Sequence, residues 1–348
     1  MMRANLWLRA ASRVVVRVAE FRATAFFELE KSAKRIPWAQ FIAPGQVAEF
    51  RVTAKKSKLY HSDAIAERLV KSLMSVVGAK NLPGTNPPAR KRAPAQPAHQ
   101  STKPQLFVVR VFHDAFTISV DTSGELLHMR GYRQAVGKAP LRETLAAALL
   151  LAADWDGSAP LLDPFCGSGT IPIEAALLAR RIPPGLHRRF AFMAWPNFDA
   201  KTWRALLHES QTAALASSPA MILGSDRDAG AIASSRANAE RAGVLADIDF
   251  QARAISAIQP PEAPGLVATN PPYGVRVSER TTLRNLYARF GQLLRARCAG
   301  WRVALYSADP RLAAEMELPL GELFRTTNGG IKVAALLVDI LKSRPEQP

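Results

Sequence analysis

The sequence predicts an α/β protein with a doubly wound, mostly parallel sheet, preceded by a smaller α+β domain. Three observations support this prediction. From Pro160 onward, short apolar runs alternate with helical patterns; the first run ends in a glycine turn that leads into a helix; and the charge of the chain is concentrated before residue 111. We therefore expect two domains with different tasks.

The formal net charge of +17 is unevenly distributed. Residues 1–110 carry 20 Lys and Arg against 6 Asp and Glu, a net +14, and residues 111–348 carry 26 against 23, a net +3. A basic domain joined to a near-neutral one indicates that the first holds a polyanion on which the second acts. Ordinary solvated surface charge is the simpler alternative.

Composition narrows the class of protein. With 348 residues, 48% of them hydrophobic, the chain can form two cores. Cys166 and Cys298 indicate neither a disulfide framework nor a cysteine metal site, and the six histidines lack metal-ligand spacing, so we expect no metal. No uninterrupted apolar run is long enough to span a membrane. We expect a monomeric, cytoplasmic protein.

The basic region has the pattern of a small α+β domain. Alternating residues predict strands, and apolar residues at helical spacing predict helices. The strands are expected at 14–18, 47–54, 106–112 and 116–120, and the helices at 26–34 and 62–77. The Arg-rich start superficially resembles a mitochondrial transit peptide, but the strand pattern favours a structural role.

Two segments of this region are candidates for contact with a polyanion. Lys55, Lys56 and Lys58 lie in the loop that leads into the helix at 62–77, where lysines suit phosphate binding. Residues 79–105 contain six prolines and no acid and are predicted to be a surface linker, which fits a merely soluble insertion equally well.

The second region follows the order of a doubly wound sheet. Strands are predicted at 160–163, 221–226, 248–252, 266–269 and 302–307. Helices are predicted at 138–151, with Pro140 in the first turn, from Thr170 to Pro183, at 229–242 and at 281–297. A closing antiparallel pair, 322–327 and 332–340, turns at Asn328-Gly329-Gly330, a hairpin signal.

The glycine turn after the first strand, DPFCGSGT, begins at Asp163. Gly167 and Gly169 let the backbone approach a ligand closely, and Asp163 can accept a hydrogen bond from an ammonium group. The turn lacks the Lys of a phosphate-binding loop and the three glycines of a dinucleotide fingerprint. It therefore suits a ligand that carries a cation.

A second motif, TNPPYG, follows the strand at 266–269. Two prolines hold the chain extended, so the Asn270 amide oxygen and the Pro271 carbonyl can act as paired acceptors beside the ring of Tyr273. Two acceptors beside an aromatic plane suit an exocyclic amino group of a nucleobase.

Together, these motifs resemble the S-adenosyl-L-methionine loop and the amino-methylation motif of class I nucleic-acid methyltransferases. The segment SGELLHMRGYRQAVGKAPLRETLAAALL is similar to the one before the catalytic core of THUMP-containing guanine-N2 methyltransferases of 23S rRNA and tRNA. The resemblance implies a THUMP-like RNA-binding domain at 1–122 and a Rossmann-like methyltransferase domain at 123–345. Relatives usually begin with a further strand and helix, so either this chain is truncated at its start or its first domain is reduced.

The resemblance also implies site residues. S-adenosyl-L-methionine would be held by Asp163, Phe165, Cys166, Gly167, Ser168, Gly169, Thr170, Asp226 and Arg227. The catalytic residues would be Asn270, Pro271, Pro272 and Tyr273. Candidate RNA contacts are Lys55, Lys56, Lys58, Arg130, Arg133 and Arg276.

The carboxylate of Asp226, at the end of the second strand of the parallel sheet, can accept both ribose hydroxyls, whereas Asp228 better fits a helix cap. One departure from the family is that Arg253 and Ala254 stand where an acid usually meets the adenine.

The expected activity is methylation of a guanine N2 amino group in rRNA or tRNA, and the sequence does not choose between these RNAs. Adenine-N6 methylation remains an alternative because NPPY motifs serve both amino groups. A non-catalytic RNA-binding assembly factor is the alternative outside enzymes.

Overall fold

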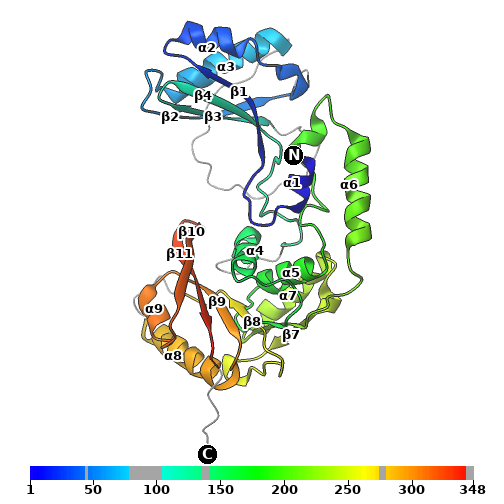
Figure 1. Cartoon of the computed structure of the whole chain (residues 1–348), viewed down its shortest axis with the longest axis vertical. Helices are drawn as coiled ribbons and strands as arrows, with labels where there is room; N and C mark the ends of the chain where they lie inside the picture. Colours follow the sequence, from blue (N-terminus) through cyan, green and yellow to red (C-terminus); the bar gives the residue numbers. More distant parts are fainter. Residues whose placement is uncertain (44–45, 78–103, 135–140, 274–279, 342–348) are drawn as a thin grey trace, which may run out of the picture. The chain divides into compact units, whose positions relative to one another are not determined.

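The computed structural model describes residues 1–43, 46–77, 104–134, 141–273 and 280–341. The chain forms two compact units, each built around its own sheet (Figure 1). Unit 1 comprises Met1–Leu6, Ser12–Leu127 and Arg188–Leu206, and unit 2 comprises Trp7–Ala11, His128–His187 and Leu207–Pro348.

Unit 1 contains a four-stranded sheet in the order β1-β4-β3-β2, in which β2 and β3 are parallel and the other pairs antiparallel. Its strands are β1 (Val15–Arg22), β2 (Ala48–Lys55), β3 (Gln105–Phe112) and β4 (Ala115–Asp121). Its helices include α2 (Phe26–Ala33) and α3 (Ser62–Val77), which lie together on one side of the sheet (Figure 1). These elements confirm the predicted strands and helices.

The alternation in the strands creates the core of unit 1. Phe50 on β2 and Phe107 on β3 are buried on the face toward the helices, stacked with their centroids 5.1 Å apart. Trp38 packs edge-on against both rings, and its indole N–H donates to the Ala33 carbonyl. Residues one position along each strand point to the opposite face.

Three of the described α-helices were not expected from the sequence: α1, α6 and the five-residue α9 (Pro310–Ala314). In α1 (Met2–Trp7), Leu6 is buried and the Asn5 amide donates to Thr122 Oγ1 at 2.7 Å. The second, α6 (Ala200–Ala213), begins after Asp199, whose carboxylate accepts from the Lys201 and Thr202 N–H groups.

Unit 2 contains a seven-stranded sheet in the order β10-β11-β9-β8-β5-β6-β7. The strands are β5 (Leu161–Asp163), β6 (Ile222–Asp226), β7 (Ile248–Ala252), β8 (Leu266–Thr269), β9 (Arg302–Ser307), β10 (Gly321–Asn328) and β11 (Ile331–Asp339). β7, β6, β5, β8 and β9 run parallel, and β11 pairs antiparallel with β9 and β10. The predicted sheet with its closing hairpin is confirmed.

Helices cover the two faces of this sheet. They are α4 (Glu143–Ala152), α5 (Thr170–Ala179), α7 (Ala229–Arg241), α8 (Arg280–Arg297) and α9 (Pro310–Ala314). Leu161 belongs to the core that contains residues of α4, α5 and α7, whereas its neighbour Leu162 belongs to the core with residues of α8 and α9. Successive residues of β5 therefore face opposite layers.

The predicted helix at 138–151 begins later than expected. α4 starts at Glu143, with Arg142 as its N-cap, and Lys138 and Pro140 lie outside the described residues. Among the helices that the structure describes, none is long and apolar enough to cross a membrane.

Candidate active site

The candidate site lies where β8, β5 and β6 end side by side. Asp163 is the last residue of β5, Thr269 of β8 and Asp226 of β6. β5 pairs with both neighbours in parallel, so the three residues share the carboxyl edge of the sheet. The chain order reverses at β5 and β8, and such a switch point is where doubly wound sheets bind ligands.

The two glycines of the loop between β5 and α5 have different tasks. Gly169 has φ +82°, and a Cβ there would lie 3.0 Å from the Cβ of Ser235 and 3.2 Å from the ring of Phe250. Gly167 has φ +53°, but a Cβ built on it would meet no described atom within 4 Å. Gly169 thus permits packing, whereas Gly167 faces open space that a ligand can fill.

Side chains of α7 hold this loop. Ser235 Oγ donates to the Gly167 carbonyl at 2.8 Å, and the Asn238 amide donates to the Ser168 carbonyl at 3.0 Å. Both side chains are fully buried. These two residues were not identified from the sequence, where only their spacing on the helix at 229–242 could have suggested a shared face.

Asp226 is half-buried and already accepts two backbone hydrogen bonds. Its Oδ2 accepts from the Gly167 N–H at 3.1 Å and its Oδ1 from the Asp228 N–H at 3.0 Å. A carboxylate has about four lone-pair positions, so acceptor capacity is left for a ligand. Asp228 caps α7 as predicted, accepting from the Gly230 and Ala231 N–H groups.

Asp163 is almost fully buried, and burial raises the pKa of its carboxyl to about 7. Thr269 Oγ1 donates to Asp163 Oδ1 at 2.6 Å, and the Phe165 N–H donates to the same oxygen at 3.1 Å. These bonds lower the pKa, whereas the neighbouring charge of Asp226 raises it. Thr269, a third residue whose role was not predicted from the sequence, connects Asp163 to the motif that follows β8.

The motif Asn270-Pro271-Pro272-Tyr273 begins directly after Thr269. Asn270 Oδ1 is buried and has no hydrogen-bond partner among the described residues. A buried acceptor without a partner costs about 1–3 kcal/mol, so this oxygen is a natural place for a ligand donor. Pro271 is buried, Pro272 is exposed, and Tyr273 is half-buried with its hydroxyl 3.5 Å from the Asn328 amide nitrogen.

The other predicted cofactor residues occupy varied surroundings. The Phe165 ring packs edge-on against Phe290 at 5.2 Å, and Cys166 is buried with Sγ 4.0 Å from Ser235 Oγ, so both side chains serve the packing of the loop. Thr170 is the buried first residue of α5, whose N-cap makes no side-chain hydrogen bond. Arg227 is exposed.

The predicted RNA contacts divide into two groups. Lys55, Lys56 and Lys58 are exposed at the end of β2 in unit 1. Arg130 is buried in an ion pair with Glu174, and Arg133 pairs with Glu143 at 2.7 Å. A phosphate contact by either arginine would therefore require breaking an internal ion pair.

Arg276 lies outside the described residues. Within the described part of the chain, no group of three or more His, Cys, Asp or Glu side chains is placed to hold a metal.

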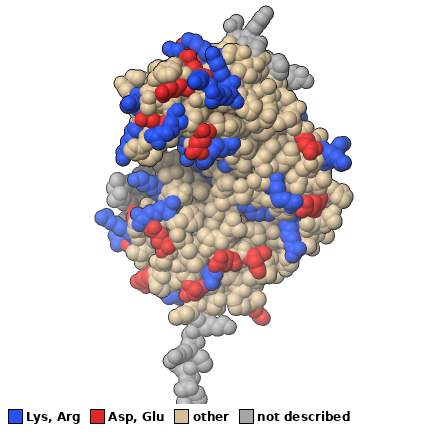
Figure 2. Space-filling view, turned by 45° about the horizontal axis from the view of Figure 1, so that its top comes forward, with Lys and Arg blue, Asp and Glu red and all other residues tan. Residues whose placement is uncertain are grey.

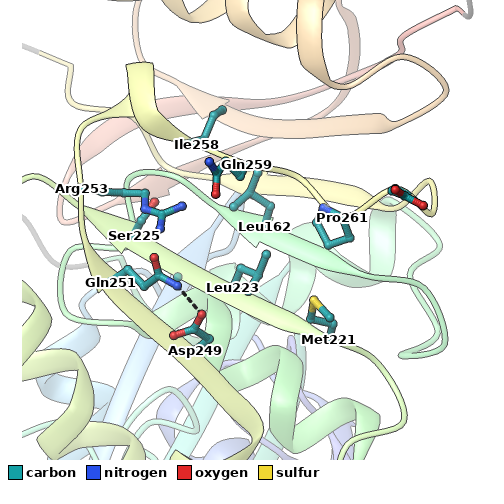
Figure 3. Close-up of a pocket in the computed structure, with 12 residues that line it drawn as sticks. Leu162, Met221, Leu223, Ser225, Asp249, Gln251, Arg253, Ile258, Gln259 and Pro261 are labelled. Carbon is teal, nitrogen blue, oxygen red and sulfur yellow. Dashed lines mark hydrogen bonds between the residues drawn. The ribbon is translucent and has the colours of Figure 1, made fainter.

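A pocket of about 490 Å³ lies beside the candidate site, along β6 and β7 (Figure 3). Its lining includes Leu162, Leu223, Gln251 and Arg253. Leu162 belongs to the core on the α8 side of the sheet, and Leu223 packs against that core, so the pocket flanks the loop at Gly167 without containing it. The Arg253 guanidinium donates to the Ala257 carbonyl at 3.4 Å, in place of the acid expected at the end of β7.

A doubly wound sheet closed by an antiparallel hairpin, with a glycine loop, an acid after β6 and an NPPY motif after β8, defines a class I methyltransferase. The comparisons with known proteins agree. The family model described as the RMKL-like methyltransferase domain matches residues 130–334. This chain belongs to that family.

Two curated relatives cover nearly the whole chain. A "Putative RNA methyltransferase" of Synechocystis is 32% identical over 97% of this chain and 85% of its own length. The ribosomal RNA large subunit methyltransferase K/L of Syntrophotalea carbinolica is 35% identical over 97% of this chain. The chain spans 48% of that second protein.

Two solved structures are similar to this chain over nearly its whole length. A "predicted N6-adenine-specific DNA methylase" from Listeria monocytogenes has a TM-score of 0.81, is 31% identical and covers 96% of this chain and 84% of its own. A "putative methyltransferase complexed with SAH" has a TM-score of 0.79, is 26% identical and covers 99% of this chain and 88% of its own.

The methyl donor of the protein is therefore S-adenosyl-L-methionine, and the residues present fit it. Open space above Gly167, remaining acceptor capacity on Asp226 and the buried carboxyl of Asp163 suit the backbone-lined cradle, the ribose hydroxyls and the amino group of that cofactor.

Proposed function

We propose that this protein transfers a methyl group from S-adenosyl-L-methionine to the exocyclic N2 amino group of a guanosine in rRNA or tRNA. Two relatives named as RNA methyltransferases, one of them for large-subunit rRNA, support an RNA substrate. The +14 charge of residues 1–110 supports it independently, since a polyanion is attracted to such a domain. We assign residues 1–122 to a THUMP-like RNA-binding domain and 123–345 to the methyltransferase domain.

The observation that carries the proposal is the buried Asn270 Oδ1, which has no hydrogen-bond partner among the described residues. It lies one residue from Thr269, which bonds Asp163 at the edge of the cofactor loop. A donor on the substrate that approaches this edge can satisfy the oxygen, and an exocyclic amino group is such a donor. The amide oxygen and the Pro271 carbonyl would then orient the amino group for attack.

Each residue has a defined task in this proposal. The cofactor supplies an activated methyl group, so the protein has mainly to align the acceptor. Asn270 and Pro271 accept hydrogen bonds from the amino group and offset the positive charge that develops on its nitrogen. Tyr273 stacks on the base, and Asp226 and Asp163 hold the cofactor.

Adenine-N6 methylation is a second candidate. It is favoured by the name of the Listeria monocytogenes structure, which describes an adenine-specific DNA methylase at 31% identity. Both amino groups present the same two hydrogens to paired acceptors, so the Asn270 geometry serves either base.

Single-turnover methyl transfer distinguishes the candidates. rRNA and tRNA from cells lacking the gene, labelled by the purified protein and digested to nucleosides, should yield N2-methylguanosine by mass spectrometry. A synthetic RNA with inosine at the modified position, which lacks the N2 amino group, should not react. Methylation of inosine RNA at the guanosine rate, or recovery of N6-methyladenosine, would contradict the proposal.

Asn270→Ala separates chemistry from binding. Removing one preorganised partner of developing charge typically slows a reaction a hundred- to a thousandfold, or about 2.7–4 kcal/mol. We expect that loss in the single-turnover rate, with cofactor and RNA affinities near those of the unaltered protein. Full activity would show that Asn270 does not contact the amino group.

A further inference from the structure

One face of the sheet in unit 1 carries exposed basic side chains around a few buried positions, among them Leu106 and Ser119. The parallel pairing of β2 and β3 places Arg51 opposite Val108, Thr53 opposite Arg110 and Lys55 opposite Phe112. These residues alternate with Phe50, Val52, Phe107 and Val109, which are buried toward the helices. Arg51, Thr53, Lys55, Arg110 and Phe112 are all exposed, so they share the face opposite the helices.

The same face continues across β4 onto β1. Arg17 lies opposite Ser119, Glu20 opposite Thr117, and Arg22 opposite Ala115. Phe21, between the last two, points to the other face, where its ring stacks on Phe116 at 5.3 Å. Arg17, Glu20 and Arg22 are exposed, which extends the basic face over the full width of the sheet.

The charge of this surface, here called the open face, is strongly biased. It consists of Arg17, Arg22, Arg51, Lys55 and Arg110 with the acids Glu20 and Glu49. Glu20 pairs with Arg17 at 2.8 Å and Glu49 with Arg51 at 3.3 Å. Lys55 and Arg110 form no ion pair with a described residue.

The helices on the other side of the sheet, α2 and α3, carry a larger share of acidic residues than the open face does. α2 has Glu28 and Glu30 beside Lys31, and α3 has Asp63 and Glu67 beside Arg68 and Lys71. Figure 2 shows Lys and Arg lying beside Asp and Glu over the upper unit of that view. The open face thus carries five cations against two acids, whereas α2 and α3 carry three against four; further exposed cations, such as Lys34 and Arg35 after α2, lie outside the open face.

Phe112 adds an aromatic surface at the edge of the open face. Its side chain is 54% exposed although it is apolar, and among the described ring pairs it has one neighbour, His113, with the two ring centroids 4.3 Å apart and the planes nearly perpendicular. A four-stranded sheet that presents an exposed aromatic ring among cations and small hydroxyl side chains can stack an unpaired base while the cations hold the flanking phosphates.

We propose that the open face binds a single-stranded segment of the RNA substrate, with Arg22, Arg51, Lys55 and Arg110 contacting phosphates and Phe112 stacking on a base. This assignment rests on the proposed RNA substrate and adds the surface and the strandedness of the RNA. An unpaired segment is favoured over a duplex because stacked, paired bases do not offer a ring face to Phe112.

The first test replaces charges on one side of the sheet only. Arg51→Gln, Lys55→Gln and Arg110→Gln are combined, and binding to oligoadenylate is measured against salt concentration by fluorescence anisotropy. The log–log slope should fall by about 0.7 per lost phosphate contact. The matched control combines Lys31→Gln, Lys34→Gln and Arg35→Gln, exposed cations on and after α2, and should leave the slope unchanged.

The outcomes are distinguishable. If the unaltered protein binds neither oligoadenylate nor rRNA, the proposed function fails together with the open face. If it binds RNA and the open-face variant has the same slope as the control, only the open face is overturned. The unaltered protein and the open-face variant are also tested for binding to phosphatidylserine vesicles. If the variant loses vesicle binding to the same extent as RNA binding, the RNA assignment is overturned in favour of a membrane surface.

The second test concerns Phe112 and strandedness. Phe112→Ala should weaken binding to oligoadenylate about five- to a hundredfold without changing the salt slope, and Phe112→Tyr should restore it. The control is Phe27→Ala, an exposed ring on α2. Equal affinities of Phe112→Ala and the unaltered protein, or a preference for oligoadenylate paired with oligouridylate, would overturn the stacking role.

Discussion

At the residue scale, Asp163 combines burial with a position at the start of the glycine loop. The pKa of its carboxyl is raised to about 7 in the folded protein, compared with about 3.9 in the unfolded chain. Between these two pH values the folded protein holds a proton that the unfolded chain has released. The contribution of this group to stability is therefore largest below about pH 4 and is lost as the pH rises toward 7. Binding of a cationic ligand depends on pH in the opposite direction, because it requires the ionised carboxylate, which forms as the pH rises.

The first prediction follows from this opposition. If Asp163 receives the amino group of the cofactor, affinity for S-adenosyl-L-methionine should rise as the pH increases from about 5.5 to about 7.5, while the free energy of unfolding falls. Calorimetry in buffers of different ionisation enthalpy should detect proton release on binding near pH 6. Asp163→Asn should abolish the pH dependence, and an affinity independent of pH in the unaltered protein would contradict the assignment.

The second prediction concerns Thr269, whose hydroxyl donates to Asp163 at 2.6 Å. Thr269→Val keeps the shape but removes the donor that lowers the pKa of Asp163. The midpoint of the affinity profile should therefore move to higher pH. Thr269→Ser should restore it, because the hydroxyl is retained. A profile in the valine variant that matches the original would show that the bond does not tune the carboxyl.

The third prediction concerns Asp226. Asp226→Ala should remove charge-assisted hydrogen bonds of about 1.5–3 kcal/mol and weaken cofactor affinity about ten- to a hundredfold. Asp228→Ala is the matched control: it removes the cap of α7 and should lower stability by about 1 kcal/mol with little change in affinity. Equal cofactor dissociation constants in the Asp226 variant and the unaltered protein would contradict the ribose assignment.

The candidate-site residues that were predicted from the sequence are those whose positions follow from local pattern. Asp163, Asp226 and Asn270 each end or follow a strand, and the carboxyl ends of parallel strands must share one edge. Ser235 and Asn238 were not predicted because they donate to backbone carbonyls of a loop that lies 68 and 70 positions earlier in the chain. Spacing along one helix does not reveal such bonds.

At the scale of elements, the two glycines of the loop before α5 differ in their surroundings. Gly167→Ala adds a methyl group to open space, whereas Gly169→Ala forces one against Ser235 and Phe250. Both residues have positive φ, so each substitution also strains the backbone by about 1 kcal/mol.

The fourth prediction uses this pair. Gly169→Ala should lower the free energy of unfolding more than Gly167→Ala does, by about 1–3 kcal/mol, because it overpacks the core. Gly167→Ala should instead lower cofactor affinity, since its methyl group occupies the cradle. Urea unfolding and calorimetry on both variants give the comparison, and a reversed order in either measurement would contradict it.

The elements that the sequence predicted are those whose apolar residues recur at a regular spacing. The predicted strands of both sheets agree with the observed ones because one or both faces of each strand are buried. α6 was missed although Asp199 caps it, because a doubly wound pattern has no place for a helix between the first helix and the second strand. α1 was missed because six residues give too short a pattern.

At the scale of the whole molecule, the two units are not consecutive stretches of chain. Residues Trp7–Ala11 belong to unit 2, although unit 1 precedes and follows them. Arg9 fixes this segment: its guanidinium donates to the Leu177 carbonyl at 3.1 Å and the Ile182 carbonyl at 2.7 Å, and its own carbonyl accepts from Arg130. Burial lowers the pKa of Arg9 to about 10, so it is charged at neutral pH.

The fifth prediction is that the methyltransferase unit depends on this segment for stability. Arg9→Gln leaves the carbonyls of Leu177 and Ile182 without their charged donor and should destabilise unit 2 by about 1.5–3 kcal/mol. Hydrogen exchange should accelerate in α5 but not in β2 to β4. Arg17→Gln, which removes a cation exposed on β1, is the control and should leave α5 unchanged. Because α5 begins at the glycine loop, the affinity for the cofactor should also decrease in the Arg9 variant. Unaltered hydrogen exchange in α5 of that variant would mean that the segment contacts unit 2 without stabilising it.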